Sequence, residues 1–574
     1  MKNILIAIRS IFKKGRHNVM KIVSLGIGLA VGLVLIAKVY FEQSYDDFYP
    51  DRDRVYQVWA KYQQNGGELK DYPQTSGGIA PTMQQQIPEI ETVTRYTSFG
   101  DWTFTMTDTK MKYSGRCIIA DSCFFDILPR PMLIGNAKEV LSTPMYVLIS
   151  SRIAKNIGGD VIGKNFTVDS SPGRTMTIGG VFEEVPENSH SRYDVIVSMA
   201  SAGRFMWEGS PTNMLGNDRY ISYVKLHKGV NPLALEEQVR TFVNSYFPPE
   251  EQQKVGLSID FSFHKLDNLH KELPQVKRMT WILSLLAFAL IFTAVMNYIL
   301  IVISSIVNRS KEVAVHKCYG ASENNIHGMM FGEALVHIVL SLILALLLIL
   351  AFRGTVEELL ATSLDSLLLS NGSLVLLGIC ILVFFVSGFM PGSLYARIPV
   401  ASAFRNYREN KRIWKKALLL VQFVATGFLV TMLVFVARQY TFMVNDRPGY
   451  AYENLAYCGL AGVDSTSRAK ILDEVMRLPG VVAATTVYQL PFEHASGNNI
   501  LLPGGTQELF NIADLYWVGN GYLDMMEIPV IQGRSFTENV TNSREVMVDR
   551  RFVEKMKLVA GWTDDVIGKD ICVT

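Results

Sequence analysis

The sequence has little net charge and few residues of the kinds that hold metals or build disulfide frameworks. Only 19% of its 574 residues are charged, and the net charge of +2 is too small to indicate a nucleic-acid partner. The six cysteines form no CxxC pair, and the nine histidines form no HxxxH or HExxH motif. We therefore expect neither a zinc site nor a disulfide scaffold. Two buried thiols are favoured over a Cys117–Cys123 bridge, which stays an alternative in an oxidising compartment.

Long hydrophobic runs are present, and they are concentrated in one part of the chain. Hydrophobic residues make up 49% of the sequence. Residues 42–278 read like a water-soluble protein, whereas residues 279–440 consist mainly of apolar runs. A helix needs about 20 apolar residues to cross the hydrocarbon core of a membrane. The sequence therefore predicts an integral membrane protein with spans at residues 22–41, 279–307, 328–352, 372–391 and 417–438.

The short segments between the spans predict which side of the membrane each segment occupies. Segments 308–327 and 393–416 are rich in lysine and arginine, whereas 353–371 has a single arginine against three acidic residues. The positive-inside rule places the N-terminus and the two basic segments in the cytoplasm. Residues 42–278 and 439–574 then lie outside the cell.

The first span and the segment before it carry further predictions. Residues 1–21 place apolar and basic side chains on different helical faces, as in an amphipathic helix on an anionic inner leaflet. No small-residue cleavage site follows span 22–41, so an uncleaved anchor is favoured over a signal peptide. Gly28 and Gly32 form a GxxxG pair that lets a neighbouring helix approach closely. Lys38 is expected to extend toward the lipid headgroups.

The chain nearly repeats itself at an interval of about 400 residues. Each copy is a span followed by an outer domain that begins in the same way, with Gly135 corresponding to Gly533. The first outer domain leads into three clustered spans, whereas the second copy stops at Thr574. We therefore expect a fragment that lacks the end of the second outer domain and about three more helices. The corresponding segments are 22–41 and 417–437, 87–90 and 478–481, 123–137 and 522–536, and 147–168 and 546–573.

Two motifs in the first outer domain suggest chemistry, and each has a structural alternative. Residues 158–165 almost match a phosphate-binding loop, but Asn165 stands where a magnesium-binding hydroxyl is needed. A turn between a helix and a strand is favoured. Ser189 and His190 are sequence neighbours with Asp194 nearby, but the members of a catalytic triad converge from distant positions. A structural loop is favoured there.

One pair of ionisable residues lies inside a predicted span. Glu333 and His337 are one helical turn apart and would suit a proton path. Other ionisable residues are scarce in the spans, so pairing of the two or contact with the membrane interface is favoured. No nucleophile elbow or carboxylate pair stands out, and we expect no enzymatic activity in this chain.

Residues 308–322 alternate charged with small apolar side chains and end near a Gly-Ala pair. This pattern predicts a short amphipathic helix parallel to the membrane, with its apolar face toward lipid or the ends of the spans. Glu312 and Lys317 would then face the cytoplasm. The alternative is an ordinary basic loop.

Several segments resemble one family, in the right order along nearly the whole chain. SYDDF and DRVYQV after the first span resemble the opening of MacB-type periplasmic domains, and residues 179–199 resemble a later segment of them. NRSKEVAVHKCYGAS (308–322) resembles the cytoplasmic motif of FtsX domains, although His316 and Cys318 depart from it. YARIPVASAFR and residues 416–450 resemble later parts of eight-helix members. The chain thus resembles the permeases of MacB/FtsX-type ABC transporters.

The resemblance implies a membrane α-helical bundle plus α+β extracytoplasmic domains. Alternating runs at 55–61, 104–106, 176–181 and 221–226 predict strands, and residues 231–246 have helical spacing. The implied layout is an N-terminal cytoplasmic helix 1–21, span 22–41, a MacB-like domain 42–278, an FtsX-like domain 279–402, a basic linker 403–416, span 417–438 and an incomplete second outer domain 439–574.

The resemblance makes residues 308–322 the coupling helix that sits in a groove of a separate ABC ATPase subunit. The residues that match this role are Arg309, Lys311, Glu312, Val313, Ala314, Val315, His316, Lys317, Gly320 and Ala321. This chain then needs no cofactor, because ATP and magnesium bind the partner. The coupling would move the outer domains and export a peptide, lipoprotein or hydrophobic toxic compound.

The resemblance also implies a bacterial inner or plasma membrane as the location. It leaves room for a periplasmic adaptor protein, and for either a homodimer or a pseudo-symmetric partner permease. The alternative function is that of FtsX itself, a regulatory membrane protein that controls an extracytoplasmic partner such as a cell-wall hydrolase.

Overall fold

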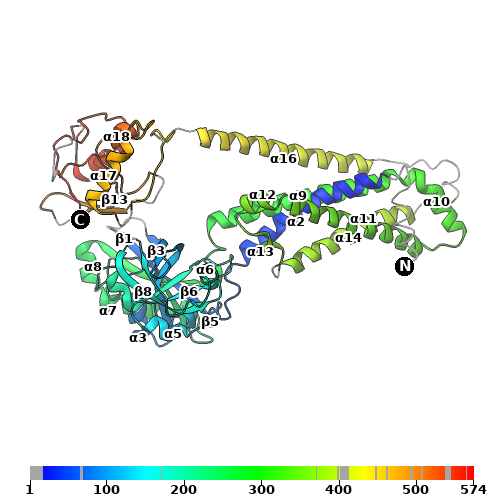
Figure 1. The fold of residues 1–574 in the computed structure, drawn as a ribbon. Coiled ribbons are helices and arrows are strands. Elements are labelled where there is room, and N and C mark those ends of the chain that lie inside the picture. The colour runs from blue at the N-terminus through cyan, green and yellow to red at the C-terminus, as the bar shows by residue number, and fades with distance from the viewer. Residues whose placement is uncertain are drawn as a thin grey trace. The chain divides into compact units, whose positions relative to one another are not determined.

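The computed structural model describes residues 17–64, 69–169, 171–216, 218–369, 372–396, 400, 413–445, 449–460, 463–491, 496–505, 508–536, 544–563 and 565–573. Most of the predicted N-terminal helix (1–16) and of the basic linker (403–412) lies outside this part. Within the described residues, five helices are long and apolar enough to cross a membrane (Figure 1). They are α2 (Asn18–Gln43), α9 (Pro274–Ser304), α11 (Glu323–Ala351), α14 (Ser373–Ala396) and α16 (Ile413–Asn445).

All five predicted spans fall on these helices, but most helices extend beyond the predicted ends. The first continues from residue 41 to Gln43, and the second begins at Pro274 instead of 279. Apolar composition marks only the lipid-crossing part of a helix, whereas backbone hydrogen bonding continues into its polar ends.

The first outer domain is an α+β fold on an eleven-stranded sheet, as expected. The sheet is mostly antiparallel, with parallel pairs β4–β9 and β6–β8. Its order is β11-β1-β10-β3-β4-β9-β6-β8-β5, with β2 beside β1 and β7 beside β3 and β8. The strands are β1 (Val55–Gln64), β2 (Lys70–Tyr72), β3 (Ile90–Met106), β4 (Lys112–Ala120), β5 (Met132–Ile134), β6 (Tyr146–Ser150), β7 (Asn165–Val168), β8 (Ser171–Phe182), β9 (Val195–Ser198), β10 (Ile221–Leu226) and β11 (Leu257–Lys265).

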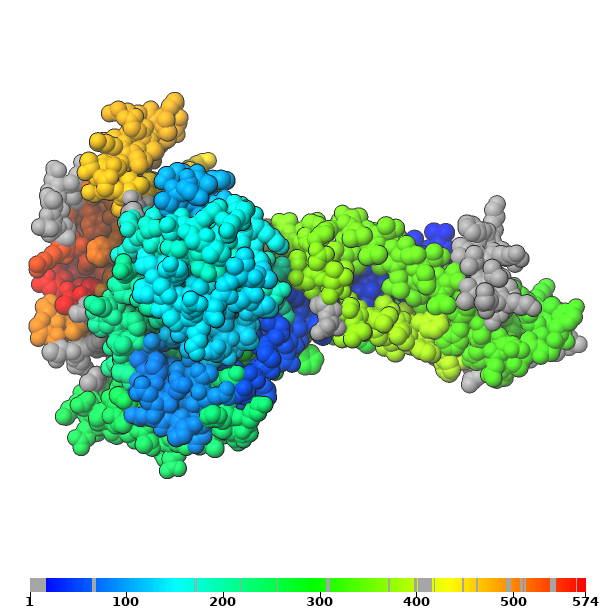
Figure 2. Space-filling model, turned by 60° about the horizontal axis from the view of Figure 1, so that its bottom comes forward, coloured from blue at the N-terminus to red at the C-terminus, as the bar shows by residue number. Residues whose placement is uncertain are grey.

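Short helices flank the strands of this sheet (Figure 1), and the space-filling view shows the domain as one continuous body (Figure 2). The predicted strand at 221–226 matches β10, whereas 104–106 is only the end of the 17-residue strand β3. The predicted helix at 231–246 begins as a 3-10 turn and continues as α7. The helices are α3 (Ile79–Gln86), α4 (Phe124–Ile127), α5 (Ala137–Ser142), α6 (Ser151–Ile157), α7 (Glu236–Tyr246) and α8 (Pro249–Val255), with 3-10 turns η1 (Met199–Arg204), η2 (Pro232–Leu235) and η3 (Leu266–Asn268).

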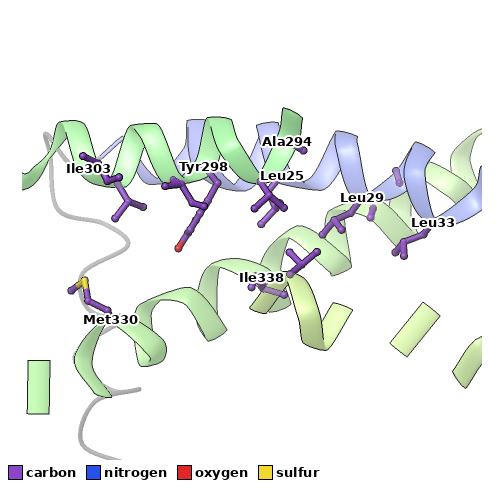
Figure 3. Packing of buried hydrophobic residues seen from close by; sticks show 14 of the residues in the cluster. Leu25, Leu29, Leu33, Ala294, Tyr298, Ile303, Met330 and Ile338 are labelled. Carbon is purple, nitrogen blue, oxygen red and sulfur yellow. The ribbon is translucent and has the colours of Figure 1, made fainter. Parts of the chain in front are cut away.

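Helices α2, α9, α11 and α14 pack into one bundle. Its buried core includes Leu25 and Leu29 of α2, Tyr298 of α9 and Ile338 of α11, which meet between the helices in Figure 3. Three short helices join the long ones: α10 (Ile306–Cys318), α12 (Arg353–Leu360) and α13 (Leu364–Leu368).

Residues from Val430 onward form a separate compact unit. It shares local structure with the first outer domain at the repeated segments. Gly135, which follows α4, has φ +85°, and Gly533, which follows α18, has φ +89°. Gly163 and Gly568 have φ +77° and +76°. The elements after α16 are α17 (Ser465–Met476), β12 (Ser496–Leu501), β13 (Glu508–Leu515), α18 (Tyr522–Met525), α19 (Arg550–Ala560) and β14 (Cys572–Val573).

Candidate coupling site

Helix α10 connects the end of α9 to the start of α11. In the connection between α9 and α10, the Ser305 hydroxyl lies 3.1 Å from the Tyr395 hydroxyl of α14. In the connection between α10 and α11, Gly320 has φ +85°, a conformation that glycine adopts without steric cost and that commonly ends helices. Ser322 then caps α11 through the backbone N–H of Asn325. The helix therefore ends at Cys318, before the predicted limit, and the Gly-Ala pair lies in the turn.

The two faces of α10 have different surroundings. Val313 and Ala314 are each 1% exposed and belong to the core of the bundle. Lys311, Val315 and His316 are exposed. The apolar face is thus narrower than the sequence predicted, because Val315 is outside it.

Lys317 was predicted to face the cytoplasm, but its side chain packs against the end of α14 instead. Its Nζ donates a hydrogen bond of 2.7 Å to the main-chain oxygen of Ala396, and its side chain is partly buried. Glu312 is also only partly exposed. The side chain of Arg309 lies outside the described part of the structure. Lys317 therefore connects α10 to the end of α14.

The predicted glycine pair lies where α2 contacts α9. A Cβ atom on Gly28 would be 2.3 Å from the Cβ of Ala294, and one on Gly32 would be 2.4 Å from Cγ1 of Ile291. Both distances are far below van der Waals contact, so only glycine fits at this separation of the helices.

Lys38 does not extend toward the headgroups as predicted. It is 7% exposed, and its Nζ lies 2.7 Å from both Oε1 of Glu42 and Oγ1 of Thr362. The second Glu42 oxygen lies 2.6 Å from Nε2 of His270, which precedes α9. The charge of Lys38 is therefore paired inside the protein, where the Glu42 carboxylate and the Thr362 hydroxyl partly compensate its desolvation.

A second set of contacts joins the end of α2 to the loop before β9. Asp46 is fully buried with φ +61°, and its carboxylate accepts from Ser189 Oγ at 3.1 Å and contacts His190 Nδ1 at 2.7 Å. The Asn188 side chain donates to the main-chain oxygen of Ser44 at 2.6 Å. The loop also reaches the bundle, because Glu187 accepts from the backbone N–H of Ser363 at 3.0 Å. We call these contacts and the Lys38–Glu42–His270 chain the junction.

Comparisons with known proteins identify both parts. The MacB-like periplasmic core domain model matches residues 20–242, and the FtsX-like permease C-terminal model matches residues 284–400. The chain belongs to the MacB/FtsX-type permeases. It is therefore a multi-pass membrane protein with an extracellular domain, of the kind that works with an ABC ATPase partner. No curated protein matches it.

Three solved structures are similar to part of this permease. A domain of a putative permease protein from Porphyromonas gingivalis is 33% identical, covering 38% of this chain and 91% of that one, with a TM-score of 0.35. The periplasmic region of MacB from Actinobacillus actinomycetemcomitans is 15% identical, with 38% and 92% covered and a TM-score of 0.26. The extracellular domain of the noncanonic ABC-type transporter YknZ from Gram-positive bacteria is 11% identical, with 36% and 98% covered and a TM-score of 0.26.

The motifs that suggested chemistry have structural roles in this permease. Residues 158–165 form the turn between α6 and β7, as favoured from the sequence. The Ser189 hydroxyl donates to Asp46 and Ser191, and Asp194 pairs with Arg152 at 2.7 Å, so these side chains do not form a triad. The described residues contain no group of three metal-ligating side chains.

Glu333 and His337 are buried inside the bundle. They are 7% and 2% exposed, and His337 Nδ1 lies 3.1 Å from the Tyr298 hydroxyl of α9. The two outcomes favoured from the sequence, pairing of the two residues and contact with the membrane interface, stay predictions.

Sequence reasoning missed the junction. Its residues include the SYDDF and NSHSRYD segments, which had served as marks of the family, and the second had also been predicted to be a structural loop. Asp46 and His190, which contact each other, are 144 residues apart in the chain. No local periodicity of the sequence predicts such a pairing. Burial and the nearby Glu42 carboxylate raise the pKa of the Tyr45 hydroxyl beside this site.

Proposed function

We propose that this chain is the permease subunit of an ABC transporter of the mechanotransmission type. A separate ATPase subunit, which holds ATP and magnesium, would dock on α10 and move it. The long helices would pass the movement to the outer domain. The work would then be done on a substrate outside the membrane, such as a peptide, lipoprotein or hydrophobic toxic compound.

The packing of α10 is the observation that carries this proposal. Val313 and Ala314 are buried in the same core as α2, α9 and α11, whereas Lys311 and His316 remain exposed to a partner. A force on the exposed face therefore acts on the bundle directly, because packed interiors deform little. A loop lying free on the membrane surface could not transmit such a force.

The junction supports the same proposal at the other end of the bundle. It joins the ends of α2 and α9 to the outer domain through buried charged groups and hydrogen bonds. The loop between α12 and α14 is held there too, through Thr362 and Ser363. Buried charged contacts depend steeply on geometry, so a shift of either helix would displace the outer domain with it.

The proposed setting is a bacterial inner or plasma membrane, with the N-terminus and α10 in the cytoplasm. A periplasmic adaptor and a second permease, identical or pseudo-symmetric, complete the proposed assembly. The orientation is supported by the basic residues of segments 308–327 and 393–416.

Co-purification from the native membrane, followed by an ATPase assay, tests the proposal. We expect a nucleotide-binding subunit in the complex, and we expect Lys311→Ala with His316→Ala to remove it by deleting exposed contacts. The matched control is Lys254→Ala with His227→Ala, a basic pair exposed on the outer domain.

Two outcomes would contradict the proposal. An ATPase retained equally by both double variants would show that α10 is not the docking site. Absence of any ATPase from a complex that is otherwise intact would favour the regulatory alternative, in which the outer domain controls an extracytoplasmic partner.

A further inference from the structure

A cavity of about 480 Å³ lies beside the junction, at the base of the first outer domain. This volume is within the range of small-molecule sites. Tyr45 lines it just after α2, and Leu273 lines it just before α9. The cavity is therefore next to the outer ends of two membrane helices.

Four of the side chains that line the cavity are basic, and none of the lining residues is acidic. Arg116, Arg192, His190 and His270 all contribute to it. The Arg192 guanidinium donates to the main-chain oxygen of Glu187, and no described carboxylate pairs with it. Such a guanidinium is free to bind an anion.

The nearest carboxylates do not cancel this positive character. Asp46 is fully buried behind His190, and Glu42 is held by Lys38 and His270. Asp194 pairs with Arg152, and the Glu187 carboxylate accepts a hydrogen bond from the backbone N–H of Ser363. Asp101 lies 4.0 Å from Arg116, but both side chains are more than half exposed, where an ion pair is weak.

The rest of the lining is aromatic and aliphatic, apart from Gln57 and Ser189. Tyr45 stacks on His270 with ring centroids 3.4 Å apart, and Leu269 and Leu273 continue this surface toward α9. Trp59 adds a further aromatic ring to the lining.

We propose that this cavity binds an anionic amphiphile. Its phosphate or carboxylate group would pair with Arg116 and Arg192, and its apolar chain would lie along Leu269 and Leu273 toward the membrane. An outer-leaflet anionic lipid and a free amphiphilic molecule share this chemistry. The site needs neither nucleotide nor the ATPase partner, so it can be tested independently of the proposed transport function.

The test is photo-crosslinking of the full chain in phosphatidylcholine nanodiscs with a diazirine-bearing alkyl phosphate, followed by peptide mapping. We expect cross-links near residues 269–273, and about tenfold less labelling in the double variant Arg116→Gln, Arg192→Gln, which loses both charge-assisted contacts. The matched control is Arg204→Gln with Arg240→Gln, two exposed arginines that do not line the cavity. All four arginines are exposed, and unchanged thermal unfolding midpoints verify folding.

Three results would overturn the proposal: labelling that maps elsewhere, equal labelling of the two double variants, or equal labelling by an alkyl trimethylammonium probe. Competition by inorganic phosphate as effective as that by unlabelled alkyl phosphate would overturn the amphiphile assignment. If the site is upheld, nanodiscs containing phosphatidylglycerol separate the two sources. Reduced labelling there identifies a bilayer lipid, and undiminished labelling identifies a free amphiphile.

Discussion

Replacing Gly28 by alanine should weaken the packing of α2 against α9. The new methyl carbon would be 2.3 Å from the Cβ of Ala294, well inside the ordinary 3.5–4.0 Å contact distance between carbon atoms. The helices must separate or bend, and overpacking of this kind costs about 1–3 kcal/mol. Alanine is also the better helix former by roughly 0.5–1 kcal/mol, so the net loss should be about 1–2 kcal/mol.

Thermal unfolding of the purified protein measures this loss, and two variants make the comparison specific. Gly378→Ala changes a glycine of α14 whose added methyl would meet nothing within 4 Å, so it should be neutral or stabilising. Adding Ala294→Gly to Gly28→Ala removes the opposing methyl, and the double variant should be more stable than the sum of the two single changes predicts. Equal unfolding midpoints for Gly28→Ala and Gly378→Ala, or strictly additive effects in the double variant, would refute the reasoning.

Three further predictions concern charge and thiol chemistry. Lys38→Met should destabilise the protein by about 3 kcal/mol by leaving Glu42 under-paired in a buried site, whereas Arg353→Ala at an exposed pair should leave the unfolding midpoint almost unchanged; equal midpoints of the two variants in thermal unfolding would contradict this. Hydrogen bonds from Arg54 and Lys225 lower the pKa of Asp51 to about 2, so its stabilising contribution is complete above the ordinary value of 3.8 and is lost as the pH falls toward 2. Discounted for solvent exposure, this contribution to the free energy of unfolding is about 1 kcal/mol or less. Asp51→Asn should therefore reduce the dependence of stability on pH between 3.8 and about 2, and an unchanged slope there would exclude the contribution of Asp51. A membrane-impermeant maleimide should label exposed Cys318 of α10 only from the cytoplasmic side. It should not label Cys117 in the folded protein, because burial raises the pKa of that thiol. Labelling of Cys318 from outside would reverse the proposed orientation.

The elements that the sequence predicted well are those with a local physical signature. Uninterrupted apolar length marked all five long helices, and alternation marked β10 at its observed limits. The glycine pair at 28 and 32 could be recognised in the sequence because close helix contact requires small residues at that spacing. The repeat could be recognised because the same turn recurs, with nearly the same φ angle at Gly163 and Gly568.

The junction was not predictable because its stability depends on long-range pairing. Lys38 near the end of an apolar run suits a headgroup contact as well as a pair with Glu42 one turn away. The distant residues Thr362, 324 positions along the chain, and His270 complete the buried site. Likewise, the sequence around Lys317 predicts a solvent-facing charge, because its hydrogen-bond acceptor, the main-chain oxygen of Ala396 at the end of α14, lies 79 residues away in the chain. Side chains whose roles depend on distant segments carry no signature in their own neighbourhood.

The uninterrupted length of α9 sets the size of any movement that it can convey. Its 31 residues contain proline only at the first position, so it has no kink-forming proline within its length. At 1.5 Å per residue, the helix is about 46 Å long, and a tilt of about 10° about one end would carry the other end through about 8 Å. Such a tilt would displace the base of the outer domain by more than the spacing of two neighbouring strands.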